Sequence, residues 1–122
     1  MTPRPLAATL SAAVKDQILD AIMTTVTHIH DATDIMAFCK VLFGEAETER
    51  ANEVRKIDAQ QHFEIDGSTG EAPANRSSAR AYVLLVDAGE EHNAREWSGL
   101  IMGKHFQRLD IEAEVENVRG GF

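Results

Sequence analysis

A short segment, DIMAFCKVLF at residues 34–43, is apolar on nearly every side, which strongly restricts how this chain can fold. Asp31 and Asp34 have the spacing of a helix start, and Gly44 is a natural helix stop, so the pattern predicts a helix that ends before Gly44. Such a helix must be buried in the core or must face a partner chain. The candidate interaction residues are therefore Ile35, Met36, Phe38 and Phe43.

Helical periodicity also marks the segments on both sides of this run. Apolar residues recur every three or four positions from Leu6 to Ile22, which predicts an amphipathic helix that opens near Pro5. Residues 45–60 place acidic residues first and basic residues last, as the helix macrodipole favours, but their apolar face is thin. We therefore expect a surface helix over 45–60.

The second half of the chain shows patterns typical of strands. Residues 82–86 form a continuous apolar run bounded by polar and glycine residues, which indicates a buried strand. HFEID at 62–66 suggests another short strand, whereas residues 90–106 return to helical spacing. Residues 109–118, LDIEAEVENV, alternate between acidic and apolar side chains, which predicts a strand with one dry face and one wet face.

These elements together predict an α+β fold. A helix-rich N-terminal half would pack on a small mixed or antiparallel sheet. Residues 67–78 are rich in glycine, proline, serine and asparagine and have no periodicity, so we expect a long loop there. The chain, residues 1–122, is then a single α+β domain with a long loop at 67–78.

The acidic side chains of the last predicted strand would share one face; they are Asp110, Glu112, Glu114 and Glu116. Charges on a sheet face or edge block pairing between sheets, and that function alone would explain the row. The alternative is that the row meets a basic surface of a partner protein. The net charge of −8 repels nucleic-acid phosphates and anionic membranes, so we expect direct binding to neither.

HIHD at residues 28–31 is the best metal-like cluster in the sequence. On a strand, His28 and His30 would share one face, and Asp31 or Asp34 could add a carboxylate, a ligand set that suits zinc or iron. On a helix, residues two apart diverge by about 200° and the site fails. The alternative interpretation is two partly exposed histidines at the boundary of an element.

Other chemical signals in the sequence are weak. Glu90, Glu91 and His92 could carry out acid–base chemistry, although glutamates in a first helical turn are ordinary partners of the helix dipole. The sequence has no phosphate-binding glycine loop, no G-x-S-x-G elbow and no H-E-x-x-H motif. Gly99 and Gly103 form a G-x-x-x-G pattern, which we interpret as a close-packing site. We therefore expect no cofactor, and an enzyme is the less favoured class.

The compartment is indicated by cysteine usage and hydropathy. Cys39 is the only cysteine and lies in the apolar run, so a buried, unreactive thiol and a reducing environment are expected. No apolar run approaches membrane-spanning length. Lys15 and Asp16 interrupt the N-terminal apolar stretch, which makes it a poor secretory signal. These features predict a cytoplasmic protein.

The order of elements expected for residues 59–118 is similar to that of one known family. A strand QQHFEID, a long loop, a strand ARAYVLLVDAG, a helix carrying Trp97 and a strand RLDIEAEV resemble the tail-terminator proteins of long-tailed bacteriophages. The first helix, LAATLSAAVKDQILDAI, is also similar to theirs. The resemblance implies a small, acidic, non-enzymatic protein that forms rings at the head-proximal end of the tail. The helices expected at 34–43 and 45–60 depart from the family pattern, and we transfer no individual residue.

These observations favour a non-enzymatic structural or interaction protein that acts as a homo-oligomer. A phage tail-terminator or neck-type assembly protein, in the cytoplasm or in the virion, is the most concrete form of this hypothesis. One alternative is a small metal-binding protein or enzyme that uses His28 and His30. Another is an acidic inhibitor that offers the row of carboxylates at 110–116 to a basic, nucleic-acid-binding protein.

Overall fold

The computed structural model describes residues 2–27, 32–66, 71–102, 115–116 and 119. The helices of these residues are α1 (Ala12–Thr27), α2 (Thr33–Phe43), α3 (Glu45–Asp66), α4 (Glu71–Asp87) and α5 (Glu91–Met102). No strand occurs in this described part of the chain. The predicted α+β fold, with a mixed or antiparallel sheet, is therefore wrong, because the described residues form an all-helical fold.

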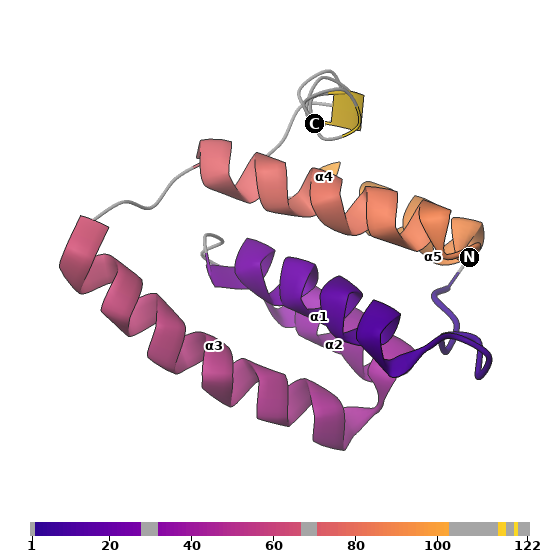
Figure 1. The fold of residues 1–122 in the computed structure, drawn as a ribbon, viewed down its shortest axis with the longest axis horizontal. Coiled ribbons are helices and arrows are strands. Elements are labelled where there is room, and N and C mark those ends of the chain that lie inside the picture. Colours follow the sequence, from indigo (N-terminus) through magenta and orange to yellow (C-terminus); the bar gives the residue numbers. More distant parts are fainter. Residues whose placement is uncertain (1, 28–31, 67–70, 103–114, 117–118, 120–122) are drawn as a thin grey trace.

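The helices lie in three layers, as Figure 1 shows. The middle layer consists of α1 and α2. On one side α4 packs against α1, α5 packs against α2, and α4 and α5 contact each other. On the opposite side α3 packs against both helices of the middle layer. This arrangement encloses α1 and α2 from two directions.

The core lies between the middle layer and the pair α4–α5. Its buried apolar side chains are Ile18, Leu19, Ala21, Ile22, Met23, Val26, Ile35, Phe38, Cys39, Leu42, Ala81, Leu85, Ala94, Trp97 and Ile101. The indole Nε1 of Trp97 donates a hydrogen bond of 2.9 Å to the backbone oxygen of Ser78. The ring centroid of Trp97 lies 5.5 Å from that of Phe38. Trp97 therefore ties α5 to both α4 and α2.

Helix α1 begins later in the chain than the apolar periodicity predicted. The backbone N–H of Val14 donates to Oγ of Ser11 at 3.2 Å, so Ser11 caps the helix that starts at Ala12. Leu6, expected inside this helix, lies in the preceding segment and packs against the core from there. Its backbone N–H donates to the backbone oxygen of Leu42 at 3.2 Å. The N-terminal segment is thereby attached to the end of α2.

The predicted helix over the apolar run is confirmed as α2, and its end before Gly44 is also confirmed. Gly44 has a φ of 91°, a left-handed conformation that favours glycine, and its N–H donates to the backbone oxygen of Lys40. Ile35 and Phe38 are buried in the core, and Met36 and Phe43 pack half-buried against it. The apolarity of α2 is therefore explained within the chain, and a role of these four residues in self-association stays a prediction.

The strand predicted at residues 82–86 is wrong, because these residues lie within α4. α4 contacts α1 on one side and α5 on another, so it needs apolar side chains over more than one narrow stripe. Val83 and Leu85 are buried, while Tyr82, Leu84 and Val86 pack half-buried against the core. A short continuous apolar run does not distinguish a buried strand from a helix buried on two sides.

The strand at 62–66 and most of the loop at 67–78 are also wrong. Residues 62–66 are the end of α3, and 71–78 belong to α4, whereas 67–70 lie outside the described residues. Pro73 is tolerated in α4 because it lies in the first turn, where backbone N–H groups have no partner within the helix. The small polar residues after it continue the helix, with Ser78 and Ala79 buried.

The predicted strand at 109–118 is described only in part. Val115 and Glu116 are helical rather than extended, and Glu116 is exposed. Asp110, Glu112 and Glu114 lie outside the described residues. The resemblance to tail terminators depended on strands at 60–66, 79–89 and 108–115, but residues 60–66 belong to α3 and residues 79–87 belong to α4. The fold therefore adds no support to that resemblance. Among the described helices, none is long and apolar enough to cross a membrane.

A candidate binding groove between α2 and α5

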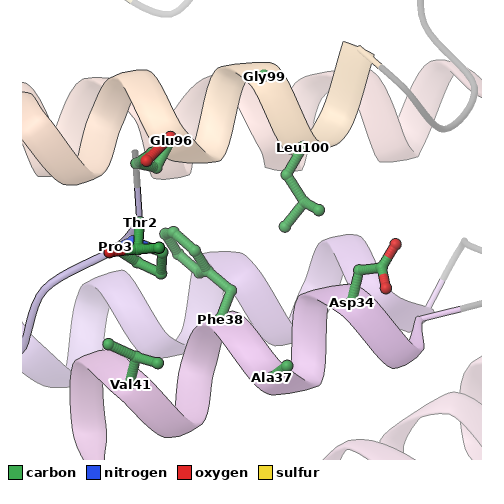
Figure 2. Close-up of a pocket in the computed structure, with 9 residues that line it drawn as sticks. All are labelled: Thr2, Pro3, Asp34, Ala37, Phe38, Val41, Glu96, Gly99 and Leu100. Atoms are coloured by element: carbon green, nitrogen blue, oxygen red, sulfur yellow. The ribbon is translucent and has the colours of Figure 1, made fainter.

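A groove with a volume of about 660 Å³ runs between α2 and α5 (Figure 2). We call it the α2–α5 groove. Its lining comes from both helices and from the start of the chain; the lining residues are Thr2, Pro3, Asp34, Ala37, Phe38, Val41, Glu96, Gly99 and Leu100. A groove of this size, lined mostly by apolar side chains with a few polar groups, is a candidate binding site.

The α2 wall of the groove is one helical stripe. Asp34, Ala37, Phe38 and Val41 are spaced by three or four residues, so they lie on one face of the helix. Phe38 forms the floor, because it is only 4% exposed and also belongs to the core. Asp34, Ala37 and Val41 are exposed, with Val41 at 39%. The groove is therefore open to solvent along the α2 side.

The α5 wall follows the same spacing, with Glu96, Gly99 and Leu100 on one face. In Figure 2 the side chain of Leu100 extends toward α2. A Cβ atom placed on Gly99 would meet no heavy atom within 4 Å. Gly99 is therefore not a close-packing site, and that prediction is wrong for this residue; Gly103 lies outside the described residues. The missing side chain of Gly99 instead leaves space in the groove wall.

The groove carries one carboxylate toward each end. Figure 2 shows Glu96 beside Thr2 and Pro3, and Asp34 at the other end, with Phe38 between them. Oε1 of Glu96 is buried and accepts no hydrogen bond from any described residue. An unpaired buried acceptor costs about 1–3 kcal/mol relative to a paired one. The Glu96 carboxylate therefore lines the groove with one oxygen that the described residues leave unpaired.

The end of the groove next to Glu96 is formed by the N-terminal strap, residues 2–7. Asn93 holds this strap: its Oδ1 accepts from the N–H of Arg4 at 2.8 Å, and its Nδ2 donates to the backbone oxygen of Arg4 at 2.9 Å. The same Nδ2 donates to Oε1 of Glu90 at 2.9 Å. The N–H of Ala7 donates to Oε2 of Glu90 at 3.3 Å. His92 adds a contact of 2.6 Å from Nε2 to the backbone oxygen of Thr2.

These contacts give the GEEHN segment a structural task. Glu90 and His92 attach the N-terminal strap to the start of α5, and their role in acid–base chemistry stays a prediction. Asn93, which the sequence analysis missed, is the centre of this arrangement and is 2% exposed. A signal was present, because Asn93 lies four residues before Trp97 and therefore on the buried face of the helix. A polar side chain on such a face requires a hydrogen-bonding partner.

The metal and thiol predictions have different outcomes. His28, His30 and Asp31 lie outside the described residues, so the proposed cluster stays a prediction. Elsewhere, within the described residues, no group of three His, Cys, Asp or Glu side chains could hold a metal ion. Cys39 is buried as predicted, and its burial raises the pKa of the thiol to about 12. A thiol with so high a pKa is a poor nucleophile at neutral pH.

Comparisons of this chain with protein-family models, with curated proteins and with solved structures gave no match.

Proposed function

We propose that this protein is a non-enzymatic interaction protein that binds a helical segment of a partner protein in the α2–α5 groove. The observation that carries the proposal is the apolar groove itself, walled by two helices. An amphipathic helix that lays its apolar face into a hydrophobic groove is a common mode of protein recognition.

The spacing of the lining residues fits a helical segment. Residues three and four apart on α2 and on α5 form two matching stripes, into which the side chains of a third helix can insert. Exposure of Ala37, Val41 and Gly99 keeps the groove open, so a small ligand would remain largely in contact with water. A polypeptide segment would cover these residues together with the apolar floor at Phe38.

The charged groups of the groove favour binding over catalysis. The ionisable lining side chains are Asp34 and Glu96, which Figure 2 shows toward opposite ends. Catalysis by a pair of acidic groups requires both to reach the same reacting atoms. Carboxylates at opposite ends are better placed to orient a bound segment than to act on one bond.

The experiment uses neutral amphipathic peptides of about 18 residues, long enough to form a helix. Titration into isotopically labelled protein should shift the backbone amide resonances of Val41, Gly99 and Leu100. Gly99→Trp, which places an indole in the open space of the groove, should abolish these shifts. Gly99→Ala is the matched control and should leave them. Shifts that survive Gly99→Trp, or that map to another surface, would show that the groove is not the binding site.

A second candidate function, self-association, is favoured by one observation on α3. Val54 and Ile57 are 51% and 59% exposed, and their spacing of three residues places them on one face of this outer helix. An apolar pair on an otherwise charged helix is a suitable centre for contact with a second copy.

The test of self-association is sedimentation of the wild type over a range of concentrations. We expect oligomers that dissociate when Val54 and Ile57 are both changed to Glu. Val41→Glu, which also replaces an exposed apolar residue but lies in the groove, is the control and should remain oligomeric. A wild-type protein that stays monomeric at high concentration would eliminate this candidate.

A further inference from the structure

We propose that the segment bound in the α2–α5 groove is basic, with a lysine or arginine that pairs with Glu96. This inference rests on the proposed function, because it specifies the chemistry of the helix that the groove binds. It adds a recognition residue and a charge requirement to a site otherwise defined by its apolar shape.

Glu96 is the first reason for a cationic partner. Its Oε1 is buried and accepts no hydrogen bond from the described residues, although the side chain lines the groove. A neutral donor would satisfy this oxygen only partly, whereas an ammonium or guanidinium group supplies both an N–H donor and the opposite charge. An ion pair in such an apolar setting is screened less by salt than one on an open surface.

The second reason is the position of the two carboxylates. In Figure 2, Glu96 lies at the end of the groove near Val41, and Asp34 lies at the end near Leu100. Asp34 and Val41 are seven residues apart on α2, which corresponds to about 10 Å along the helix. A bound helix of this length would therefore place one flanking residue near Glu96 and another, seven positions away, toward the Asp34 end of the groove. Its apolar residues between these positions would face Phe38 and Leu100.

Charge also distinguishes between the segments that could bind in the α2–α5 groove. The chain's own segment 109–118 is acidic, and a second copy of the chain carries a net charge of −8. Both would bring negative charge to a groove that already contains two carboxylates, and like charges repel most strongly where water is excluded. A basic segment of a different protein is attracted both by Glu96 and by the overall field of this chain.

The test uses model helical peptides of about 18 residues that share one leucine face and differ only at two flanking positions seven apart. These positions carry lysine in one peptide, glutamine in the second and glutamate in the third. Binding is measured by titration into the full-length wild-type protein and into Glu96→Gln, which keeps the shape of the side chain and removes its charge. Glu49→Gln is the matched control, because it removes one exposed carboxylate from α3, which does not line the groove.

The lysine peptide should bind the wild type most tightly and the glutamate peptide least tightly. Glu96→Gln should weaken the lysine peptide about tenfold, the effect of losing one ionic hydrogen bond, and should leave the glutamine peptide unchanged. Glu49→Gln should leave both affinities unchanged. Circular dichroism of each variant confirms that the helices are retained.

The inference is overturned if Glu96→Gln does not reduce the preference for the lysine peptide over the glutamine peptide. It is also overturned if Glu49→Gln reduces this preference equally, because the lysine peptide is then attracted by the overall negative charge of the protein and not by Glu96. If all three peptides bind the groove with equal affinity and Gly99→Trp abolishes binding, the proposed function holds and the charge requirement fails. If none of the peptides reaches the groove, both proposals fail. Binding of a small cationic amphiphile such as dodecylamine, without binding of any peptide, would also overturn the inference in favour of a small ligand.

Discussion

Asn93 is expected to be a strong determinant of stability, although it lies outside the apolar core cluster. Its side chain makes two hydrogen bonds to the backbone of Arg4 and a third to Glu90, and it is almost completely buried. We predict that Asn93→Ala releases the N-terminal strap from the start of α5. The chain would then lose both the hydrogen bonds of Asn93 and much of the packing that the strap contributes.

The magnitude follows from the bonds that are lost. Each of the two bonds to the Arg4 backbone contributes about 1 kcal/mol, and the bond to the Glu90 carboxylate about 1.5 kcal/mol or more. Arg4 is exposed and Glu90 is half-buried, so both recover part of this energy by bonding to water. We therefore expect a loss of about 2–3 kcal/mol in the free energy of unfolding. For a chain of this length the midpoint of thermal unfolding should fall by about 10 °C.

Urea and thermal unfolding, followed by circular dichroism, measure this loss. Asn93→Ala should be compared in the full chain and in a chain that begins at residue 6. In the shortened chain the two bonds to Arg4 are already absent, so the same substitution should cost about 1 kcal/mol or less. An equal cost in both chains would show that Asn93 does not act through the strap. A cost below about 0.5 kcal/mol in the full chain would show that the hydrogen bonds of Asn93 do not stabilise the fold.

Three further predictions concern the core and the groove. Phe38→Asp should unfold the protein rather than release monomers, because it buries a carboxylate and removes the ring that contacts Trp97; retained helix content in far-ultraviolet circular dichroism would contradict this. Burial raises the pKa of the Cys39 thiol from 9.0 to about 12. As the pH rises, the thiol therefore ionises in the unfolded chain before it ionises in the folded protein. The contribution of this thiol to stability is then intact below pH 9 and is lost between pH 9 and 12. Between about pH 8 and about pH 11, the free energy of unfolding in urea should therefore fall further for the wild type than for Cys39→Ala. Gly99→Ala should raise the free energy of unfolding by about 0.5–1 kcal/mol, because a helical glycine is replaced where a Cβ meets no atom; a destabilised variant would show that the space is not open.

The helices of the N-terminal half could be predicted from local patterns. The apolar run of α2 ends at Gly44, and the acidic start of α3 marks a surface helix, as expected. The second half could not be assigned in this way. The run at 82–86 is equally compatible with a buried strand and with a helix between two neighbours, and only its contact with both α1 and α5 settles the matter. The composition of residues 71–78 predicts a loop, but these residues are helical, because local propensity is a weak effect that tertiary packing overrides.

The groove could not be found from sequence, because its walls lie far apart in the chain. The apolar run identifies Phe38 as a candidate, but nothing in the sequence associates Glu96 and Leu100 with it. The space between these residues depends on the position of α5 relative to α2, and on the strap that Asn93 attaches. Neither follows from the pattern of one segment.

Properties that are local, or that sum over the chain, can be predicted from the amino-acid sequence alone. These are the acidic charge, the helix of the apolar run with its glycine stop, and the burial of the single thiol. Only the packing of the helices shows that residues 82–86 are helical and that Asn93 has buried partners. It also shows that Oε1 of Glu96 has no hydrogen-bond partner among the described residues. The physical reason is that burial and hydrogen bonding depend on which surfaces meet. A periodic pattern shows which face of an element is apolar, whereas the packing of distant elements decides what covers it.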